Sequence, residues 1–200
     1  KRKTKSFNRL YGDDAKNVMY ATANKLAQKE QVHKVMYYKD FIKLVEGNPT
    51  TKFLNLVCEV KPTQVTLVPD AEDAITSSAG WNTKKHAKFL RGVIDELKME
   101  GIRTSIFVDP DISIIEAALD TGTDRIELYT ENYARAYDFD REKGITPYIV
   151  AAEKAKKIGI GVNAGHDLNL KNLTYFTQNI PDLLEVSIGH ALISESLYLG

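Results

Sequence analysis

Two glycine–histidine turns near the C-terminal end of the chain carry residue types that can bind an anion and move protons. Gly165-His166 follows the predicted strand 160–164, and Gly189-His190 follows the predicted strand 184–188. Glycines let backbone N–H groups approach the oxygens of an anion closely, and the dipole of a following helix favours negative charge. A histidine beside a bound phosphate can exchange protons near neutral pH. Together the two turns predict a phosphate site.

Glu127 lies inside a predicted strand that should be buried, so its carboxylate needs a partner more than a carboxylate in an exposed loop does. Residues alternate sides along a strand, so Arg125, Glu127 and Tyr129 share one side, while Ile126 and Leu128 share the other. A buried carboxylate must be hydrogen-bonded, paired with a cation or protonated. We therefore expect Glu127 to face the interior, with Arg125 as the candidate cation.

Strands and helices alternate from residue 50 onward, and the polar groups fall at the carboxyl ends of strands. This pattern predicts an α/β fold of βαβ units with a parallel sheet, in which ligands bind at that end. We expect Asn169 to cap the helix after the first histidine turn, and Pro147 to lie in the first turn of its helix. Pattern alone leaves a doubly wound sheet and a barrel both open. The predicted strands are 64–68, 104–108, 125–129, 160–164 and 184–188, and the predicted helices are 51–60, 83–100, 112–120, 145–158 and 170–177, with polar loops over 71–82 and 130–144.

The two ends of the chain give different signals. We expect a helix over 13–29 and a short strand over 32–38, followed by a segment over 39–45 that could be either helix or strand. A break follows at Gly47-Asn48-Pro49. The last helix starts at Ala191 and stops within its expected length, which indicates truncation. Its apolar residues should then be incompletely covered, and exposed apolar area favours self-association. These residues are Leu192, Ile193, Leu197 and Leu199.

Composition argues against several classes of partner. Lys plus Arg and Asp plus Glu number 27 each, so no global field attracts nucleic acid or an anionic membrane. No apolar run is long enough to span a bilayer, and no secretory signal is visible. The four histidines lack metal-ligand spacing, and no glycine-rich nucleotide motif occurs. The single cysteine, Cys58, lies on the apolar face of a predicted helix, which fits a core residue in a cytoplasmic protein.

Four segments at the strand ends resemble the pyridoxine 5′-phosphate synthase family. They are QVTLVP at 64–69, RIELYT at 125–130, VNAGHDL at 162–168 and EVSIGHA at 185–191, in the family's order, and the resemblance covers about residues 45–200. It implies a (β/α)8 TIM-barrel fold and the condensation of 1-deoxy-D-xylulose 5-phosphate with 3-amino-2-oxopropyl phosphate in vitamin B6 biosynthesis. It also implies that no metal or organic cofactor takes part and that the protein forms a homo-oligomer.

The resemblance implies three catalytic residues. Glu46 matches the general-base glutamate of the family, and Glu127 matches the carboxylate proposed to stabilise charged intermediates. His166 matches the histidine that donates a proton.

The resemblance also implies four substrate-binding residues. Thr76 matches a contact to the deoxyxylulose phosphate, while Gly189 and His190 match the cradle for the aminoketone phosphate. Asp167 stands where many members have glycine. A position that binds through its backbone N–H tolerates this change when the carboxylate turns away from the phosphate.

The N-terminal residues depart from the family pattern. The family begins with an Asn-x-Asp-His-like string followed by an arginine, and its second strand ends in a His-x-Arg string. Neither occurs in residues 1–45, where His33 is the candidate for a further family histidine. We therefore predict one α/β barrel domain over 1–200, with a divergent segment over 1–45 and the family-like barrel portion over 46–200. The barrel is expected to be incomplete or altered at both termini.

Two functions follow from these patterns. The first is an enzyme of vitamin B6 synthesis that acts on small phosphorylated substrates and releases inorganic phosphate. The second is a non-catalytic phosphate-binding or assembly fragment derived from the same barrel. The missing N-terminal motifs favour the fragment, and the strand-end residues favour the enzyme.

Overall fold

The computed structural model describes residues 44–70 and 79–199. The predicted helix 13–29 and strand 32–38 lie outside these residues. From residue 44 onward the chain forms one compact unit. Its elements are β1 (Leu44–Gly47), α3 (Thr51–Val60), β2 (Gln64–Leu67), α4 (Thr83–Met99), β3 (Arg103–Val108), α5 (Ile112–Ala118), the 3-10 helix η3 (Leu119–Thr121), β4 (Arg125–Tyr129), α6 (Glu131–Ile158), β5 (Gly161–Gly165), α7 (Leu173–Asn179), β6 (Leu183–Ser187) and α8 (His190–Leu199).

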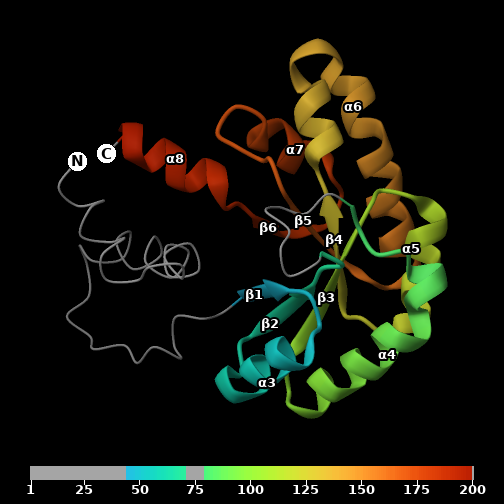
Figure 1. Ribbon diagram of the computed structural model, residues 1–200. Coiled ribbons are helices and arrows are strands. Elements are labelled where there is room, and N and C mark those ends of the chain that lie inside the picture. Colours follow the sequence, from blue (N-terminus) through green and yellow to red (C-terminus); the bar gives the residue numbers. More distant parts are fainter. Residues whose placement is uncertain (1–43, 71–78, 200) are drawn as a thin grey trace. The chain divides into compact units, whose positions relative to one another are not determined.

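The six strands form one parallel sheet in the order β1-β2-β3-β4-β5-β6. A helical connection separates each strand from the next, and α4, α5 and α6 follow one another along the outside of the strands (Figure 1). The sheet curls, because Arg103 on β3 reaches Glu185 on β6 with a nitrogen–oxygen distance of 3.0 Å across two intervening strands. This half-barrel confirms the predicted α/β barrel type, incomplete in the described residues.

Apolar residues on one face of the strands build the main core against the helices. Ile106, Ile126 and Leu128 are fully buried and belong to one cluster with Leu90 and Ile94 of α4. Burying a side chain of this size contributes roughly 1.5–3 kcal/mol. Because this core fixes the outward direction of alternate residues, the residues between them must face the inside of the half-barrel.

The inner face is mainly polar. Thr66, Ser105, Glu127 and Asn163 are buried there. Strand register sets Glu127 beside Asn163 on β5. A small apolar cluster, formed by Val68, Phe107 and Tyr129, lies on the same face nearer the carboxyl ends of the strands. The curl of the sheet therefore gathers polar side chains from several strands.

The region after β4 differs from its prediction, because α6 begins at Glu131 rather than at residue 145. The expected polar loop is a helical arm that ends at a kink, where Asp140 has φ −156° and ψ 78°. The Asp140 carboxylate accepts from the backbone N–H of Lys143 at 3.0 Å and so starts the second arm. Pro147 lies inside the helix, beyond the first turn of that arm. The prediction for Pro147 was wrong.

The helix after β5 also starts later than predicted. Asn172, not Asn169, is the N-cap residue of α7. The Asn169 side chain instead accepts from the backbone N–H groups of Lys171 and Asn172, at 2.9 and 3.2 Å, and so holds the turn before the helix. The other predicted strands and helices agree with the structure to within a few residues.

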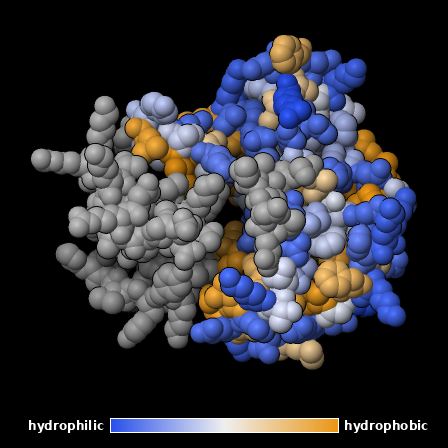
Figure 2. Space-filling model, viewed as in Figure 1, coloured by the Kyte–Doolittle hydropathy of each residue, from blue (hydrophilic) through white to orange (hydrophobic). Residues whose placement is uncertain are grey.

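Helix α8 presents apolar side chains at the surface. Leu192 is 51 % exposed and Leu197 is 79 % exposed, and orange apolar atoms lie along this helix in Figure 2. The prediction of incomplete cover is confirmed at these two positions, whereas the side chain of Leu199 lies outside the described set. Cys58 is half-buried and packs against the core, as predicted. No helix in residues 44–70 and 79–199 is long and apolar enough to cross a membrane.

Candidate active site

Glu127 is the centre of the polar inner face. Its side chain is 1 % exposed, and the Thr66 hydroxyl of β2 donates to its Oε2 at 3.0 Å. Burial raises the pKa of Glu127, although hydrogen bonds from Thr66 and Ser187 act in the opposite direction. These partners come from β2 and β6, on either side of β4. The expectation that the Glu127 carboxylate faces the interior agrees with this geometry.

Gly165 makes room for this carboxylate. A Cβ atom at Gly165 would lie 2.2 Å from Glu127 Oε1 and 3.1 Å from the Cβ of Ser187. The carboxylate therefore lies against the bare backbone at the last residue of β5. Only glycine fits at this position while Glu127 keeps its place.

Arg125 is not the cation that pairs with Glu127, which corrects the sequence interpretation. Arg125 binds Glu185 instead, at 2.7 Å, and also donates to Asn163 at 3.1 Å. Arg103 joins the same group through Glu185. Arg103, Arg125 and Glu185 thus form a charged cluster nearer the amino ends of the strands. Glu127 has hydroxyl partners instead.

Glu46 lies on β1 and interacts electrostatically with Glu127. Its register partner on β2 is Thr66, whose hydroxyl binds Glu127. Burial raises the pKa of Glu46 to about 8, and the negative charges of Glu127 and Asp70 add to the rise. The Glu46 side chain is exposed on the edge strand of the described sheet. Solvent there weakens the effect of burial without reversing its direction. The two carboxylic acids therefore titrate as a linked pair.

His166 lies in a turn with an unusual backbone. His166 and Asp167 have φ angles of 82° and 58°, in the left-handed region that favours glycine. The side chain of His166 is 18 % exposed, and its Nδ1 lies 3.0 Å from Asp167 Oδ2. Asp167 therefore directs its carboxylate toward the imidazole. The positive φ at Asp167 also gives a physical reason why glycine suits this position.

The second glycine–histidine turn follows the neighbouring strand. Gly189 links β6 to α8, and His190 is the first residue of α8 and is exposed. Since β5 and β6 are paired, the two turns leave adjacent strands at their carboxyl ends. Thr76 lies outside the described residues. Electrostatic interactions and the His166–Asp167 contact bring Glu46, Glu127, His166 and Asp167 together, whereas only the pairing of β5 with β6 places Gly189 and His190 near them.

Sequence reasoning missed several residues that surround these groups. Thr66 and Ser187 are ordinary hydroxyl residues within strands, and only the curl of the sheet turns both toward Glu127. Tyr129 and Thr130, at the end of β4, contact the His166 turn. Alternation placed Tyr129 on the same side of the strand as Glu127, but it gave no sign of the contact between its ring and His166.

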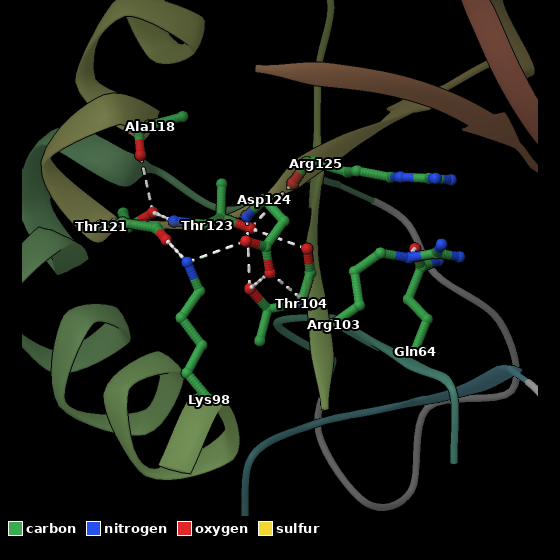
Figure 3. A network of polar contacts seen from close by, with 10 residues as sticks. Gln64, Lys98, Arg103, Thr104, Ala118, Thr121, Thr123, Asp124 and Arg125 are labelled. Atoms are coloured by element: carbon green, nitrogen blue, oxygen red, sulfur yellow. Dashed lines mark hydrogen bonds and ion pairs between the residues drawn. The ribbon is translucent and has the colours of Figure 1, made fainter. Parts of the chain in front are cut away.

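The amino ends of the strands carry a different polar network (Figure 3). Asp124 accepts from the Thr104 backbone N–H at 2.8 Å and forms an ion pair with Lys98 at 2.8 Å. Figure 3 shows these groups on one side of the strands, while Arg103 and Arg125 point to the other side. A shallow hollow at the surface is lined by Lys98, Gly101, Ile102, Arg103 and Asp124. It lies at the opposite end from the candidate site.

The chain matches the family model described as pyridoxal phosphate biosynthesis protein PdxJ over residues 18–200. This match begins before residues 45–200, the stretch that carries the resemblance. The chain is 64 % identical over 156 residues to pyridoxine 5′-phosphate synthase of Flavobacterium johnsoniae and 61 % identical over 156 residues to that of Parabacteroides distasonis. Each alignment covers 78 % of this chain and 66 % of the relative, so the chain spans just under two thirds of the length of these relatives.

A solved structure supports the same fold class. The chain is similar to the tryptophan synthase A-subunit of Pyrococcus furiosus, with a TM-score of 0.51 and 17 % identity. This similarity covers 84 % of the chain and 67 % of that structure, and at such low identity it concerns the fold alone. The family match and the close relatives, taken with the half-barrel, show that the chain belongs to the PdxJ family.

Proposed function

We propose that this protein works as a pyridoxine 5′-phosphate synthase. It would condense 1-deoxy-D-xylulose 5-phosphate with 3-amino-2-oxopropyl phosphate and release inorganic phosphate and water. The names of the close relatives support this reaction. The observation that carries the proposal is the buried Glu127 carboxyl group, held by hydroxyl groups at the carboxyl ends of the strands.

Glu127 would stabilise cationic intermediates. The reaction begins with imine formation between the substrate amine and the ketone, and an iminium ion carries a positive charge. Burial raises the pKa of Glu127, and a cation that arrives beside it favours the ionised form. The carboxyl group would therefore lose its proton as the positive charge develops. Its negative charge would then stabilise the cationic intermediate more than the substrate.

Glu46 and His166 would move protons. A general base works best when its pKa lies near the working pH, and the pKa of Glu46 is raised to about 8. Turnover that depends on the deprotonated form of Glu46 should then increase as the pH approaches 8. His166, beside Asp167, would donate a proton during loss of water or phosphate.

The two glycine–histidine turns would bind phosphate. Gly189 precedes the N-terminus of α8, a ten-residue helix whose dipole favours an anion, and Asp167 and His190 would complete the cradle. Thr76 would contact the second phosphate. No metal or organic cofactor takes part in this proposal. We further propose that the protein works in the cytoplasm as a homo-oligomer, supported by the exposed Leu192 and Leu197.

A product assay tests the reaction. The full chain is supplied with both substrates, and pyridoxine 5′-phosphate and inorganic phosphate are measured over time. Equal amounts of the two products would support the proposal, whereas a folded chain that forms neither would contradict it. Gly189→Asp should weaken phosphate binding sharply in a titration, because it adds a negative charge at the proposed cradle.

A non-catalytic phosphate-binding or assembly fragment is the second candidate. One observation favours it: residues 1–45 contain neither of the two N-terminal motifs expected in the family. Phosphate binding without product formation would identify this function. Sedimentation over a wide concentration range would show whether the chain assembles.

A further inference from the structure

The turn that carries His166 requires something to hold it. His166 and Asp167 are consecutive residues with positive φ, at 82° and 58°, and neither is glycine. A side chain in this region is strained, and such a conformation persists only where surrounding contacts enforce it. The contacts on this turn should therefore include groups whose main effect is to fix the direction of the imidazole.

Thr130 provides one of these contacts. Its hydroxyl donates to the Gly165 carbonyl at 2.8 Å and also contacts the His166 carbonyl. The Thr130 backbone N–H donates to the same Gly165 carbonyl at 3.0 Å. Thr130 is fully buried, so water does not compete for these bonds. Thr130, which directly follows β4, therefore binds the carbonyl groups of both Gly165 and His166 at the start of the strained turn.

The position of Thr130 in the sequence makes this arrangement unusual. Thr130 is the N-cap residue of α6, where a threonine hydroxyl normally accepts from the first turn of its own helix. Its hydroxyl makes no such bond here. It is directed across to the histidine turn on β5 instead. The helix gives up a favourable cap, which indicates that the hydroxyl serves the turn.

Tyr129 provides the second contact. Its ring lies edge-on to the imidazole of His166, with 4.9 Å between ring centroids and 85° between the planes. Phe107 supports the ring, at 5.1 Å between centroids. The Tyr129 hydroxyl donates to Glu131, which also pairs with Arg135. The tyrosine ring is therefore fixed at both of its ends.

We infer that Tyr129 and Thr130 are positioning residues that hold His166 beside Glu127 for proton transfer. Thr130 fixes the backbone of the histidine turn, and the ring of Tyr129 fixes the orientation of the imidazole. This inference rests on the role of His166 in the proposed function. Neither residue needs to touch the substrate to act in this way.

Thr130→Val tests the backbone contact, because valine has nearly the same volume but no hydroxyl. We expect kcat to fall about tenfold to a hundredfold, with KM changed less than about threefold, as for a catalytic group misplaced by a fraction of an ångström. Thr130→Ser restores the hydroxyl and should recover most of the lost turnover. Thr121→Val is the matched control, since the buried Thr121 hydroxyl donates to the Ala118 carbonyl at 2.6 Å, away from the histidine turn.

Tyr129→Leu and Tyr129→Phe test the ring. Phenylalanine keeps the edge-on ring and should retain kcat to within about threefold, whereas leucine removes it and should lower kcat about tenfold. The imidazole NMR signals of His166, assigned with a His166→Asn variant, give a readout that needs no substrate. They should move in Thr130→Val and Tyr129→Leu and stay in place in Thr121→Val.

The outcomes separate this inference from the proposed function. If the wild-type chain forms no product, the proposed function fails, and the NMR signals still test the positioning. If Thr130→Val or Tyr129→Leu folds and leaves both kcat and the His166 signals unchanged, the inference is wrong. If Thr130→Val does not fold, the two Tyr129 variants decide in the same way.

Discussion

The acidic side chains at the two ends of the strands have opposite kinds of partner. At the amino ends, Asp124 pairs with Lys98 at 2.8 Å, and Glu185 lies between two arginines. At the carboxyl ends, Glu127 is bound by hydroxyl groups and shares its surroundings with Glu46, a second acid. The ion pairs at the amino ends stabilise the fold. The raised pKa values of the two acids at the carboxyl ends allow these acids to take up and release protons.

The pKa values change in opposite directions at the two ends. Burial by itself would raise the pKa of Asp124, but hydrogen bonds from Lys98 and Thr104 outweigh it and lower the pKa. Burial raises the pKa of both Glu127 and Glu46. A buried acid that is held by hydroxyl groups, such as Glu127, is typical of functional sites, where stability is given up for chemistry. The carboxyl ends of the strands therefore carry the candidate catalytic acids, and the amino ends carry ion pairs that stabilise the fold.

Gly165→Ala should produce the largest effect, because it acts directly on Glu127. The new Cβ would lie 2.2 Å from Glu127 Oε1, so the carboxylate must move. We expect turnover to fall about a hundredfold or more, the scale for a displaced catalytic group. Gly92→Ala is the control, because no atom beyond its chain neighbours and its own helix backbone lies within 4 Å of its new Cβ. Equal turnover in the two variants would show that the position of the Glu127 carboxylate does not matter.

Glu185→Gln tests how much the ion pairs at the amino ends of the strands stabilise the fold. It removes the ion pairs to Arg103 and Arg125. Because about a third of the Glu185 side chain is exposed (35 %), we expect a loss of about 2 kcal/mol, below the cost of a fully buried pair. Urea unfolding measures it. Glu100→Gln, which breaks the exposed pair with Lys61, should cost much less, because solvent screens that pair. Similar losses in both variants would contradict the expectation that the charged cluster of Arg103, Arg125 and Glu185 stabilises the fold more than an exposed ion pair does.

Glu46 should make the protein less stable as the pH rises. Its pKa is 4.5 in the unfolded chain and about 8 in the folded protein. Its contribution to stability is fully present below pH 4.5 and is lost progressively up to about pH 8, because the folded state keeps the proton longer. Allowing for solvent screening, we expect a change on the order of 1 kcal/mol. Glu46→Gln should flatten this part of the stability curve, and an unchanged slope would exclude the raised pKa.

Asp124→Asn should produce the smallest effect, and with the opposite dependence on pH. The lowered pKa of Asp124 means that its stabilisation is present above the unfolded value of 3.8 and is lost as the pH falls through the folded value. Since 36 % of its side chain is exposed, the loss at pH 7 should be roughly 0.5–1 kcal/mol. Acid titrations of the variant and the wild type should converge once the pH lies well below the folded pKa of Asp124. A gap that persists there would point to lost packing instead.

Local pattern was sufficient to predict β2 to β6, whose apolar residues are mostly buried, but it did not identify β1, where no residue is fully buried. It failed for residues 131–144, where polar residues and Gly144 obscure a helical arm that the Asp140 kink interrupts. It also failed for the partner of Arg125. That partner, Glu185, lies 60 positions away in the sequence and meets Arg125 only because the sheet curls. Thr66 and Ser187 became recognisable as partners of Glu127 for the same reason.

The most direct test of this account is the variant Glu127→Gln, measured for turnover and stability together. Glutamine keeps the shape and can still accept from the Thr66 hydroxyl, but it cannot become negatively charged. Because Arg125 pairs with Glu185 rather than with Glu127, the free energy of unfolding should change by less than about 1 kcal/mol. Turnover should fall about a hundredfold or more. A stable variant with full turnover would contradict the assignment of chemistry to this end of the sheet.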